Sequence, residues 1–491
     1  MMNHIPIGIH NLFPFLLTVV PLLAAVFAYL AGGRSKTAKW ILAVTAVLHS
    51  AMSCTVAFFP QWRNSAGHWI GFDTLGVIIL GVTSVLFLAV SLQTLFWMDA
   101  DDRYAAGHAH LLIFGRPIFL PAQLAFLATM TLVISARNFG LLWVAVEATT
   151  LVSAPLICYH LSDRSLEAMW KYLLICSVGI GLALFGTMAM ALSAHAAGVH
   201  GLGFDELAAA SEAIHPGWFK TAFVFILAGY GTKMGLAPFH TWLPDAHSEA
   251  PGTISALLSG ALLNCSFLGI VRVMDIAPGS LQSLCNELLL TLGMLSLAVA
   301  AFFILRQTDF KRMLAYSSVE HMGLIAILWA IGLEPAAVLH IGGHSLIKMT
   351  LFMLAGNILL AYGTRNIAYV GGIFKTLNAN ALLWITGMLL ICGTPPSPLF
   401  ITEFFLVQEL LTGGHPILGA LVLLLLFTVF AGMARICLKM CMGEAINLPA
   451  QERLAACERL SLLPSVSLAG ALMLGTAVSI LILKTIVKAG C

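Results

Sequence analysis

Long apolar segments recur along the whole chain, each about as long as a membrane is thick. A hydrocarbon layer of about 30 Å requires roughly 20 apolar residues in a helix, and about fourteen such runs are present. They lie near residues 8–31, 39–60, 73–98, 116–136, 138–160, 168–194, 219–243, 251–272, 282–305, 309–332, 335–361, 380–412, 416–439 and 462–486. Only 9% of the 491 residues are charged, whereas roughly 25% is typical of soluble domains. The sequence therefore predicts an all-α polytopic membrane protein.

Lysine and arginine residues in the short loops predict the orientation of the chain. With the N-terminus outside, most of them fall on the inner side, as the positive-inside rule requires. That side then includes Arg34, Lys36, Arg103, Arg306, Arg312, Arg365, Arg435 and Arg459. An even number of spans places both termini on the periplasmic face of a bacterial inner membrane.

Ten cysteines are scattered singly through apolar segments, without a CxxC motif. Cys437 and Cys441 share a helix face, but two thiols alone make a weak metal site. We expect the cysteines to be small buried hydrophobes. The chain is therefore expected to have no metal, no cofactor and no catalytic residue of its own, and any redox centre should belong to another subunit.

Two Gly/Pro-rich segments interrupt the helical pattern, GLAPFH at residues 235–240 and GTPPSP at residues 393–398. Proline removes a backbone donor, so each run is predicted to be a discontinuous helix. The breaks fall in runs seven and twelve. This spacing predicts two inverted repeats, formed by runs four to eight and nine to thirteen. The predicted divisions are an N-terminal segment 1–115, a first repeat 116–272, a second repeat 273–439 and a C-terminal part 440–491.

Ionisable residues stand inside several runs, where each costs several kcal/mol. Glu147 has apolar neighbours on both sides, and Lys233 directly precedes the first break. Opposite charges on neighbouring helices hold each other ionised, so we expect these two within ion-pair or single-water distance. Further buried ionisable residues are Lys171, Glu320, His321, His340, His344, Lys348 and Glu403.

A row of titratable residues occupies one helix face in the eleventh run. His340, His344 and Lys348 recur every four residues, so they share that face. Imidazole titrates near neutral pH and passes a proton between its nitrogens, which favours a proton relay over zinc binding or packing. By contrast, Lys171 and Lys311 lie near predicted helix starts, where a charge can equally serve packing or reach the interface.

The segment HTWLPDAHSEAP, residues 240–251, looks too polar for the bilayer. We expect it to form an interfacial turn. Its Asp245, His247 and Glu249 either gather protons at the cytoplasmic mouth or cap the next helix, whose Pro251 suits a first-turn position. The sequence leaves both readings open.

Several long motifs carry a family resemblance. The segments GTKMGLAPFHTWLPDAHSEAP, DFKRMLAYSSVEHMG, HSLIKMTLF and GTPPSPLFITEF resemble the antiporter-like subunits of respiratory complex I, Mrp cation antiporters and energy-converting membrane hydrogenases. WVAVEATTLVSAPL, AMWKYLLICSVG and AYSSVEHMGL look most like the hydrogenase-4 component F family. The resemblance covers roughly residues 115–440 and implies two inverted five-helix repeats with helices seven and twelve broken.

The resemblance also implies site residues. By motif these are Glu147, Lys171, Lys233, Lys311, His344, Lys348 and Glu403, and His240, Glu320 and His340 complete the predicted proton-translocation set. One departure concerns the eighth run, 251–272, which lacks the central Lys or His of many such subunits. Asn264 is its only strong polar group and cannot carry net charge, so water must bridge this helix or the route must bypass it.

The leading hypothesis is a proton-translocating subunit of a redox-driven complex, most closely a hydrogenase-4 or formate hydrogenlyase-type membrane arm. Alternatives are a subunit of an NADH-quinone oxidoreductase, a Na+/H+ antiporter, a coupling subunit for inorganic-carbon uptake, and a passive scaffold. Sodium prefers several oxygen ligands, whereas these residues are largely Lys, His and isolated Glu, which favours protons. The expected partners are the bilayer, other membrane subunits and a soluble redox arm, but no nucleic acid.

Overall fold

Helices dominate the computed structural model, which describes residues 9–64, 69–104, 112–113, 116–444 and 451–488. In this part of the chain, twelve helices are long and apolar enough to cross a membrane, and two shorter apolar helices accompany them. Each predicted run coincides with one of these helices or with a helix pair. The prediction of an all-α polytopic fold is therefore confirmed. Both chain ends, which the orientation analysis placed outside, lie beyond the described residues.

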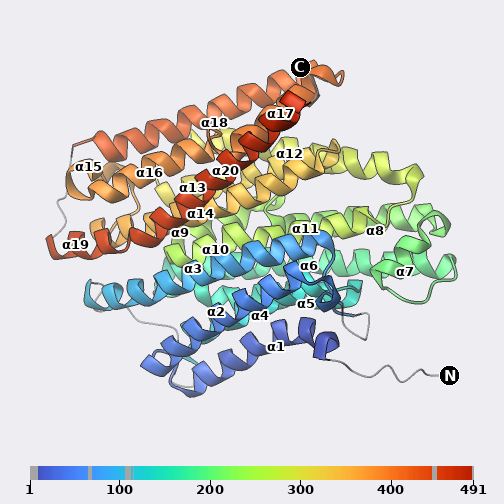
Figure 1. Cartoon of the computed structure of the whole chain (residues 1–491), viewed down its shortest axis with the longest axis horizontal. Coiled ribbons are helices and arrows are strands. Elements are labelled where there is room, and N and C mark those ends of the chain that lie inside the picture. The colour runs from blue at the N-terminus through green and yellow to red at the C-terminus, as the bar shows by residue number, and fades with distance from the viewer. Residues whose placement is uncertain (1–8, 65–68, 105–111, 114–115, 445–450, 489–491) are drawn as a thin grey trace. The chain divides into compact units, whose positions relative to one another are not determined.

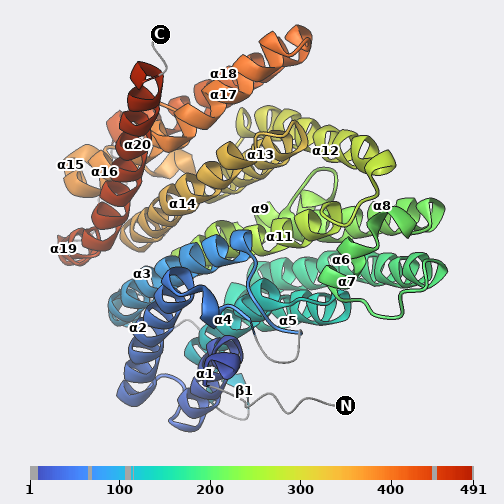
Figure 2. The ribbon, with the colours of Figure 1, turned by 45° about the vertical axis from the view of Figure 1, so that its right-hand side comes forward.

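The chain divides into two compact units. Unit 1 comprises Met1–Ser91, Ala109–Met234 and Ala261–Cys285. Its helices are α1 (Ile9–Leu30), α2 (Lys36–Phe58), the first part of α3 (Thr74–Tyr104), α4 (Phe119–Ser135), α5 (Phe139–Ile157), α6 (Asp163–Ala196), α7 (Phe204–Ala209), α8 (Pro216–Met234) and α11 (Leu263–Met274), with the short turns η1 (Pro60–Trp62), η2 (Ser211–Ala213) and η5 (Gly279–Leu281). A two-residue strand pair, β1 (Leu112–Ile113) and β2 (Arg116–Pro117), also belongs to it. Within this unit α1 lies beside α2 and α4 (Figure 2).

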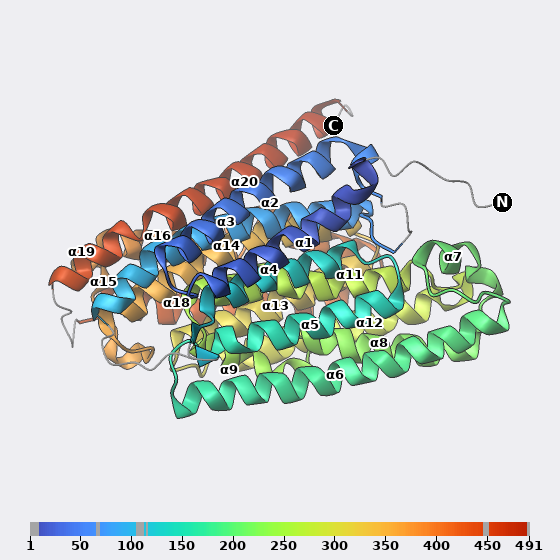
Figure 3. The same ribbon diagram turned by 90° about the horizontal axis from the view of Figure 1, so that it is seen from below.

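Small residues bring α6 and α8 of unit 1 together along their length (Figure 3). A Cβ atom added at Gly229 of α8 would lie 2.5 Å from the carbonyl oxygen of Gly179 on α6. Membrane helices approach this closely only where side chains are small. The close approach sets the side chains of α6 directly against the last turn of α8, where Lys233 is located.

Unit 2 comprises Leu92–His108, Gly235–Gly260 and Asn286–Cys491. Besides the end of α3, its elements are η3 (Phe239–Thr241), α9 (Trp242–Glu249), α10 (Gly252–Leu257), α12 (Gln282–Ile304), α13 (Phe310–Ala330), α14 (Glu334–Tyr362), η6 (Ile367–Tyr369), α15 (Ile373–Thr376), α16 (Asn378–Ile391), α17 (Pro398–Thr412), α18 (Pro416–Met442), α19 (Gln451–Arg459) and α20 (Leu462–Lys488). Within it α14 packs against α13, α16, α17 and α20 (Figure 1). The two units are defined by contacts within the chain, whereas the predicted inverted repeats are defined by symmetry. The repeats therefore stay a prediction.

Both predicted helix breaks are present. α8 ends at Met234, and Gly235 takes a positive φ of 80° before η3 and α9 continue the path. α16 ends at Ile391, and α17 begins only at Pro398. Hydroxyl groups satisfy backbone groups freed at both breaks. Ser296 accepts from the Ala237 N–H at 2.9 Å, and Ser397 donates to the Leu390 carbonyl at 2.7 Å, as a break at membrane depth requires.

The segment 240–251 is largely a helix and not a turn, contrary to the sequence-based expectation. Its central part is α9, and six of the eight residues of this helix are buried. Its acids have arginine partners from distant parts of the chain. Asp245 pairs with Arg312 at 2.9 Å, and Glu249 pairs with Arg365 at 2.8 Å. The expectation failed because the polarity of a segment does not reveal whether a partner from a distant part of the chain neutralises it.

The eighth predicted run is not a regular α-helix. A π-helical turn, η4 (Leu258–Leu262), separates α10 from α11. The hydroxyl of Ser345 donates to the Gly260 carbonyl in this turn at 2.7 Å. Single π-turns inside α-helices are often located at functional sites, and nothing in the sequence predicted this one.

Candidate functional site

Lys233 is fully buried in unit 1, surrounded by hydroxyl groups. Its ammonium donates to the Thr150 hydroxyl at 2.8 Å and to the Tyr172 hydroxyl at 2.5 Å. Since Tyr172 accepts from the ammonium, its own proton is directed to Ser153, whose oxygen lies 2.6 Å away. Ser153 in turn donates to the Thr149 carbonyl at 2.6 Å. Neutral groups therefore solvate this buried charge, and each hydroxyl among them can donate as well as accept.

Glu147 does not form an ion pair with Lys233 in the described part of the chain. Its Oε1 accepts a hydrogen bond from Ser177 at 2.8 Å, while its Oε2 is buried and has no described hydrogen-bond partner. Thr150 follows Glu147 by three residues and so faces the same side of α5. Of the two predicted distances, the ion pair is therefore not present in the described chain, where a hydroxyl of α5 contacts the ammonium, and the single-water distance stays a prediction.

Lys171 lies outside this cluster. Its side chain is 47% exposed and pairs with Glu167 at 2.6 Å on the outer face of α6. Successive helical residues point about 100° apart, so only one of two neighbours can face Lys233. The fold turns Tyr172 inward, and the sequence-based set did not include this residue.

In unit 2, Lys311 supports the end of α9. Its ammonium donates to the carbonyl groups of Ser248, at 3.1 Å, and of Ala250. Arg365 donates to the same Ser248 carbonyl at 2.7 Å. Cations complement the partial negative charge of a helix C-terminus. Lys311 therefore stabilises the C-terminal end of α9, which is the packing role that the sequence left open beside proton translocation.

Two histidines of unit 2 form a directed hydrogen-bond chain. Nδ1 of His321 lies 3.0 Å from Nε2 of His340, and Nδ1 of His340 lies 2.7 Å from the Thr402 hydroxyl. Because Thr402 donates to the Leu399 carbonyl at 2.8 Å, it accepts from His340 Nδ1–H. In neutral rings His340 Nε2 is then an acceptor, and His321 Nδ1–H is its donor. This leaves His321 Nε2, which has no described partner, as the base that can take up a proton.

Lys348, His344 and Glu320 lie buried in the same unit on α13 and α14. Lys348 donates to the Leu314 carbonyl at 2.7 Å, and no described carboxylate forms an ion pair with it. The His344 ring lies 5.2 Å from that of His321, and neither of its nitrogens has a described partner. Buried polar groups in such a position normally bind water. The cluster therefore offers several titratable groups, and the His344 nitrogens have no described hydrogen-bond partner.

His247 is a further buried residue that the sequence-based set left out. It belongs to α9, its ring stacks 4.8 Å from that of Phe352, and neither ring nitrogen has a described partner. The Lys348 ammonium lies 6.0 Å from the centroid of the same Phe352 ring. The sequence offered His247 as a residue that either gathers protons or caps the next helix, and local polarity alone did not indicate that it is buried.

The two remaining predicted residues also belong to unit 2. His240, in η3, is buried with its ring 6.1 Å from that of Tyr316. Glu403 is partly buried on α17, and its carboxylate lies so close to Gly393 that a Cβ atom there would clash. Gly393 also has a positive φ of 66°. The second break therefore requires glycine for both its backbone and its contact with Glu403. Within the described chain, no group of three or more His, Cys, Asp or Glu is arranged to hold a metal ion.

Comparisons with known proteins agree with these features. A family described as NADH:quinone oxidoreductase/Mrp antiporter, transmembrane, matches residues 136–430. A hydrogenase-4 component F homologue of Methylacidiphilum infernorum is 36% identical over 331 residues, which is 65% of this chain and 68% of that protein. The resemblance inferred from the motifs is therefore confirmed.

Solved structures share the fold. A chain of the membrane-bound sulfane sulfur reductase, an archaeal respiratory complex, superimposes with a TM-score of 0.79 at 22% identity, covering 94% of this chain and 96% of that one. A chain of the Mrp complex from Dietzia sp. gives a TM-score of 0.80 at 18% identity, covering 95% and 96%. The protein thus belongs to the NADH:quinone oxidoreductase/Mrp antiporter family of membrane subunits.

Proposed function

We propose that this chain is a proton-translocating membrane subunit of a redox-driven complex, most closely of the hydrogenase-4 type. The observation that carries the proposal is Lys233, a fully buried amine held by hydroxyl groups. An ionisable residue buried at membrane depth is costly and is by default a candidate functional residue, and unlike Lys311 this lysine contacts no helix-end carbonyl in the described chain. The family and the name of the component F homologue support the same reading.

The hydroxyl groups suit a lysine that changes its protonation state. While Lys233 is an ammonium, the hydroxyl oxygens of Thr150 and Tyr172 accept hydrogen bonds from it. When Lys233 loses its proton, one of the two hydroxyls can rotate and donate to the single lone pair of the neutral amine, while the other still accepts an N–H. Both states therefore keep their hydrogen bonds, and a change of charge nearby can shift the balance between them. Glu147 lies on the same face of α5 as Thr150. Its carboxylate is therefore the one whose protonation would respond to a change of charge on Lys233.

Unit 2 would relay the proton through its histidines and Lys348. A proton taken up at Nε2 of His321 releases the Nδ1 proton toward Nε2 of His340, which is the direction set by the chain to Thr402. The hydroxyl of Thr402 is anchored to a backbone carbonyl, so this branch ends there. Onward transfer therefore requires water beside His344 or Lys348.

Protons are favoured over sodium as the transported ion, because the amine of Lys233 can itself carry a proton, whereas an ammonium has no lone pair with which to bind Na+. The chain would have no redox centre. It would work beside other membrane subunits and a soluble redox arm in a bacterial inner membrane, with both termini outside. The exposed face of α6 that carries Lys171 and Glu167 is available for a neighbouring subunit.

The decisive experiment measures protons moved per electron by the whole complex in sealed vesicles, with either of two substitutions at Lys233. Lys233→Ala removes the amine, whereas Lys233→Arg keeps a charge that is not released at physiological pH. General acid–base groups contribute about 10²- to 10⁴-fold, so we expect at least about tenfold less pumping from both variants, with assembly intact. Asn264→Ala is the control and should have a smaller effect.

Each outcome has a clear meaning. Full pumping by Lys233→Ala would reject the proposal in favour of a scaffold. Full pumping by Lys233→Arg alone would show that a fixed charge suffices and that Lys233 never releases a proton. Transport that requires sodium at constant pH would replace the proton by Na+ and make the chain an antiporter subunit.

A further inference from the structure

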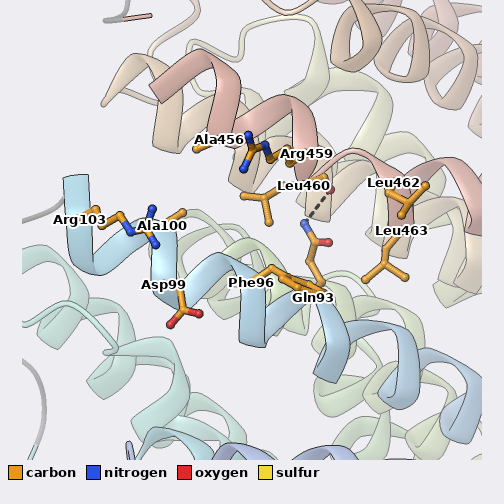
Figure 4. Close-up of a pocket in the computed structure, with 10 residues that line it drawn as sticks. All are labelled: Gln93, Phe96, Asp99, Ala100, Arg103, Ala456, Arg459, Leu460, Leu462 and Leu463. Atoms are coloured by element: carbon orange, nitrogen blue, oxygen red, sulfur yellow. Dashed lines mark hydrogen bonds between the residues drawn. The ribbon is translucent and has the colours of Figure 1, made fainter. Parts of the chain in front are cut away.

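A pocket of about 430 Å³ opens in unit 2 between the end of α3 and the corner formed by α19 and α20. Figure 4 shows its lining, which divides into two chemical halves. Arg103 and Arg459 form a charged half, and Phe96, Leu462 and Leu463 form an apolar half. None of these side chains belongs to the clusters described above.

The two arginines retain their charge without a partner from the described chain, because neither forms an ion pair or hydrogen bond there. Asp99 also lines the pocket, but it is engaged in another interaction. Figure 4 draws its carboxylate on the opposite side of α3 from Arg459. The pocket therefore presents two guanidinium groups, each able to bind a phosphate group bidentately.

The apolar half is exposed although the side chains are large. Phe96 is 63% exposed and Leu462 is 69% exposed. The floor between the halves is fixed, since buried Gln93 donates to the Leu460 carbonyl at 3.0 Å, the contact dashed in Figure 4. A soluble anion would use the arginines but leave this apolar surface uncovered.

The pocket lies where apolar helices reach their charged ends. One candidate membrane span runs over Thr74–Arg103 and another over Gln451–Val478. In both, the arginine stands at the polar end and the apolar lining residues stand on the side of the hydrophobic stretch. This is the order of headgroup and acyl chain in a phospholipid leaflet, and the positive-inside rule predicts that Arg103 and Arg459 lie on the same side of the membrane.

We propose that this pocket binds an anionic glycerophospholipid. Its phosphate would bind Arg103 and Arg459, and its acyl chains would cover Phe96, Leu462 and Leu463. Basic pockets at the ends of membrane helices bind lipid headgroups by this combination of charge and apolar contact. The lipid would join the end of α3 to α19 and α20, the elements that flank the pocket. The inference does not depend on which ion the chain transports.

The test uses the full chain purified in a neutral detergent and titrated with phosphatidylglycerol or phosphatidylcholine, with bound lipid counted by native mass spectrometry. A cation beside an anionic headgroup contributes about a fivefold factor. We therefore expect each of Arg103→Gln and Arg459→Gln to weaken phosphatidylglycerol binding about fivefold, and the double variant about 25-fold. Arg164→Gln, an exposed arginine of α6 that does not line the pocket, is the matched control and should change nothing.

A second pair of measurements separates the lipid from a free anion. Leu462→Ser should weaken binding of phosphatidylglycerol while leaving any effect of inorganic phosphate on the thermal unfolding unchanged. Equal binding of phosphatidylglycerol and phosphatidylcholine, or equal binding by the double variant and the wild type, would overturn the proposal. So would a double variant that binds lipid normally but loses a protein subunit of the complex, because the arginines would then bind that protein.

Discussion

Lys233 in unit 1 and Lys348 in unit 2 are both fully buried lysines, but their surroundings differ. Lys233 donates to two hydroxyl groups, whereas Lys348 donates to one backbone carbonyl. A hydroxyl can reverse its hydrogen bond when the amine loses a proton, but a carbonyl can only accept. Lys233 therefore has partners for both charge states within the protein, while Lys348 depends on water or on the nearby histidines for the rest of its hydrogen bonds.

The number of titratable neighbours also differs. Beside Lys233, unit 1 offers one carboxylate, Glu147, and otherwise hydroxyl and thiol groups such as those of Tyr172 and Cys176. Unit 2 places His321, His344 and Glu320 on the helices that carry Lys348 or pack against it. A cluster with one base has no substitute when that base is lost, whereas a cluster with several can share a proton among them. The two units should therefore respond differently to single substitutions, and the following experiments test that difference.

The largest effect in unit 2 is expected from Lys348→Gln. It removes the amine of the cluster while keeping a donor for the Leu314 carbonyl, so the helix packing should survive. General acid–base groups contribute about 10²- to 10⁴-fold, and we expect proton pumping by the assembled complex to fall by about 10²-fold. Pumping within about twofold of the wild type would mean that the histidines alone carry protons through unit 2.

Tyr172→Phe tests whether the hydroxyl groups around Lys233 are needed for proton pumping. It keeps the ring beside Lys233 but removes one of the two hydroxyl groups that solvate the ammonium. Hydrogen bonds to charged groups contribute about 1.5–3 kcal/mol, so pumping should fall by about tenfold. The adjacent Lys171→Ala is the matched control, since that side chain faces outward. A larger loss from Lys171→Ala than from Tyr172→Phe would reverse the assignment of the inward-facing residue on α6.

His321→Asn should have a smaller effect, because His344 lies 5.2 Å from it, measured between ring centroids, and can take over as a base. We expect a loss of about threefold, which corresponds to less than 1 kcal/mol in the barrier. The double variant with His344→Asn should lose much more than the product of the single effects. Simple multiplication of the two effects in the proton-to-electron ratio would show that the histidines act independently.

Asp73→Asn should change stability without changing pumping, and so serves as the reference for a purely structural charge. Burial alone would raise the pKa of Asp73, but the charges of Arg272 and Arg137 and the hydrogen bonds from Arg272 and the Gly76 N–H hold that pKa below its ordinary value. A depressed pKa in the folded state adds stability at neutral pH that is lost as the pH falls through that value.

The measurement is thermal unfolding of the wild type and Asp73→Asn at pH 7 and near pH 3. Hydrogen bonds to a charged group contribute about 1.5–3 kcal/mol, so the variant should be less stable at pH 7, and the gap should shrink in acid. A constant gap would mean that the carboxylate charge is not what the arginines stabilise.

Much of the fold could be predicted because membrane helices must be long, apolar and internally hydrogen-bonded. The same rule located the first break, since Gly235 and Pro238 cannot continue a helix that faces lipid. Buried charges are costly enough that Lys233 and Lys348 were identified from their apolar surroundings alone. The direction in which a side chain points was harder to predict from the sequence. Lys171 and Tyr172 are adjacent, and no local property decides which of them faces inward.

Partners from distant parts of the chain were the other missing information. His247 was interpreted as part of an interfacial turn, because the arginine partners of its acidic neighbours come from α13 and from beyond α14. The predicted Glu147–Lys233 contact was drawn from opposite charge, but the hydroxyl of Tyr172, from a third helix, solvates the amine instead. Pairwise charge arguments overlook neutral groups that can solvate a charge equally well.

The π-turn η4 has a mechanical consequence. It uses one residue more than an α-helical turn, and the division into units falls inside it, between Gly260 and Ala261. Such a turn can migrate along a helix one residue at a time, rotating one side chain by about 100° per step while both helix ends stay in place. Ser259, which bonds Ser318 at 2.8 Å, is in the turn and would swing out of that contact in one step. A movement of this turn by one residue would thus reorient a polar side chain of the eighth span, although this span has no charged residue at its centre.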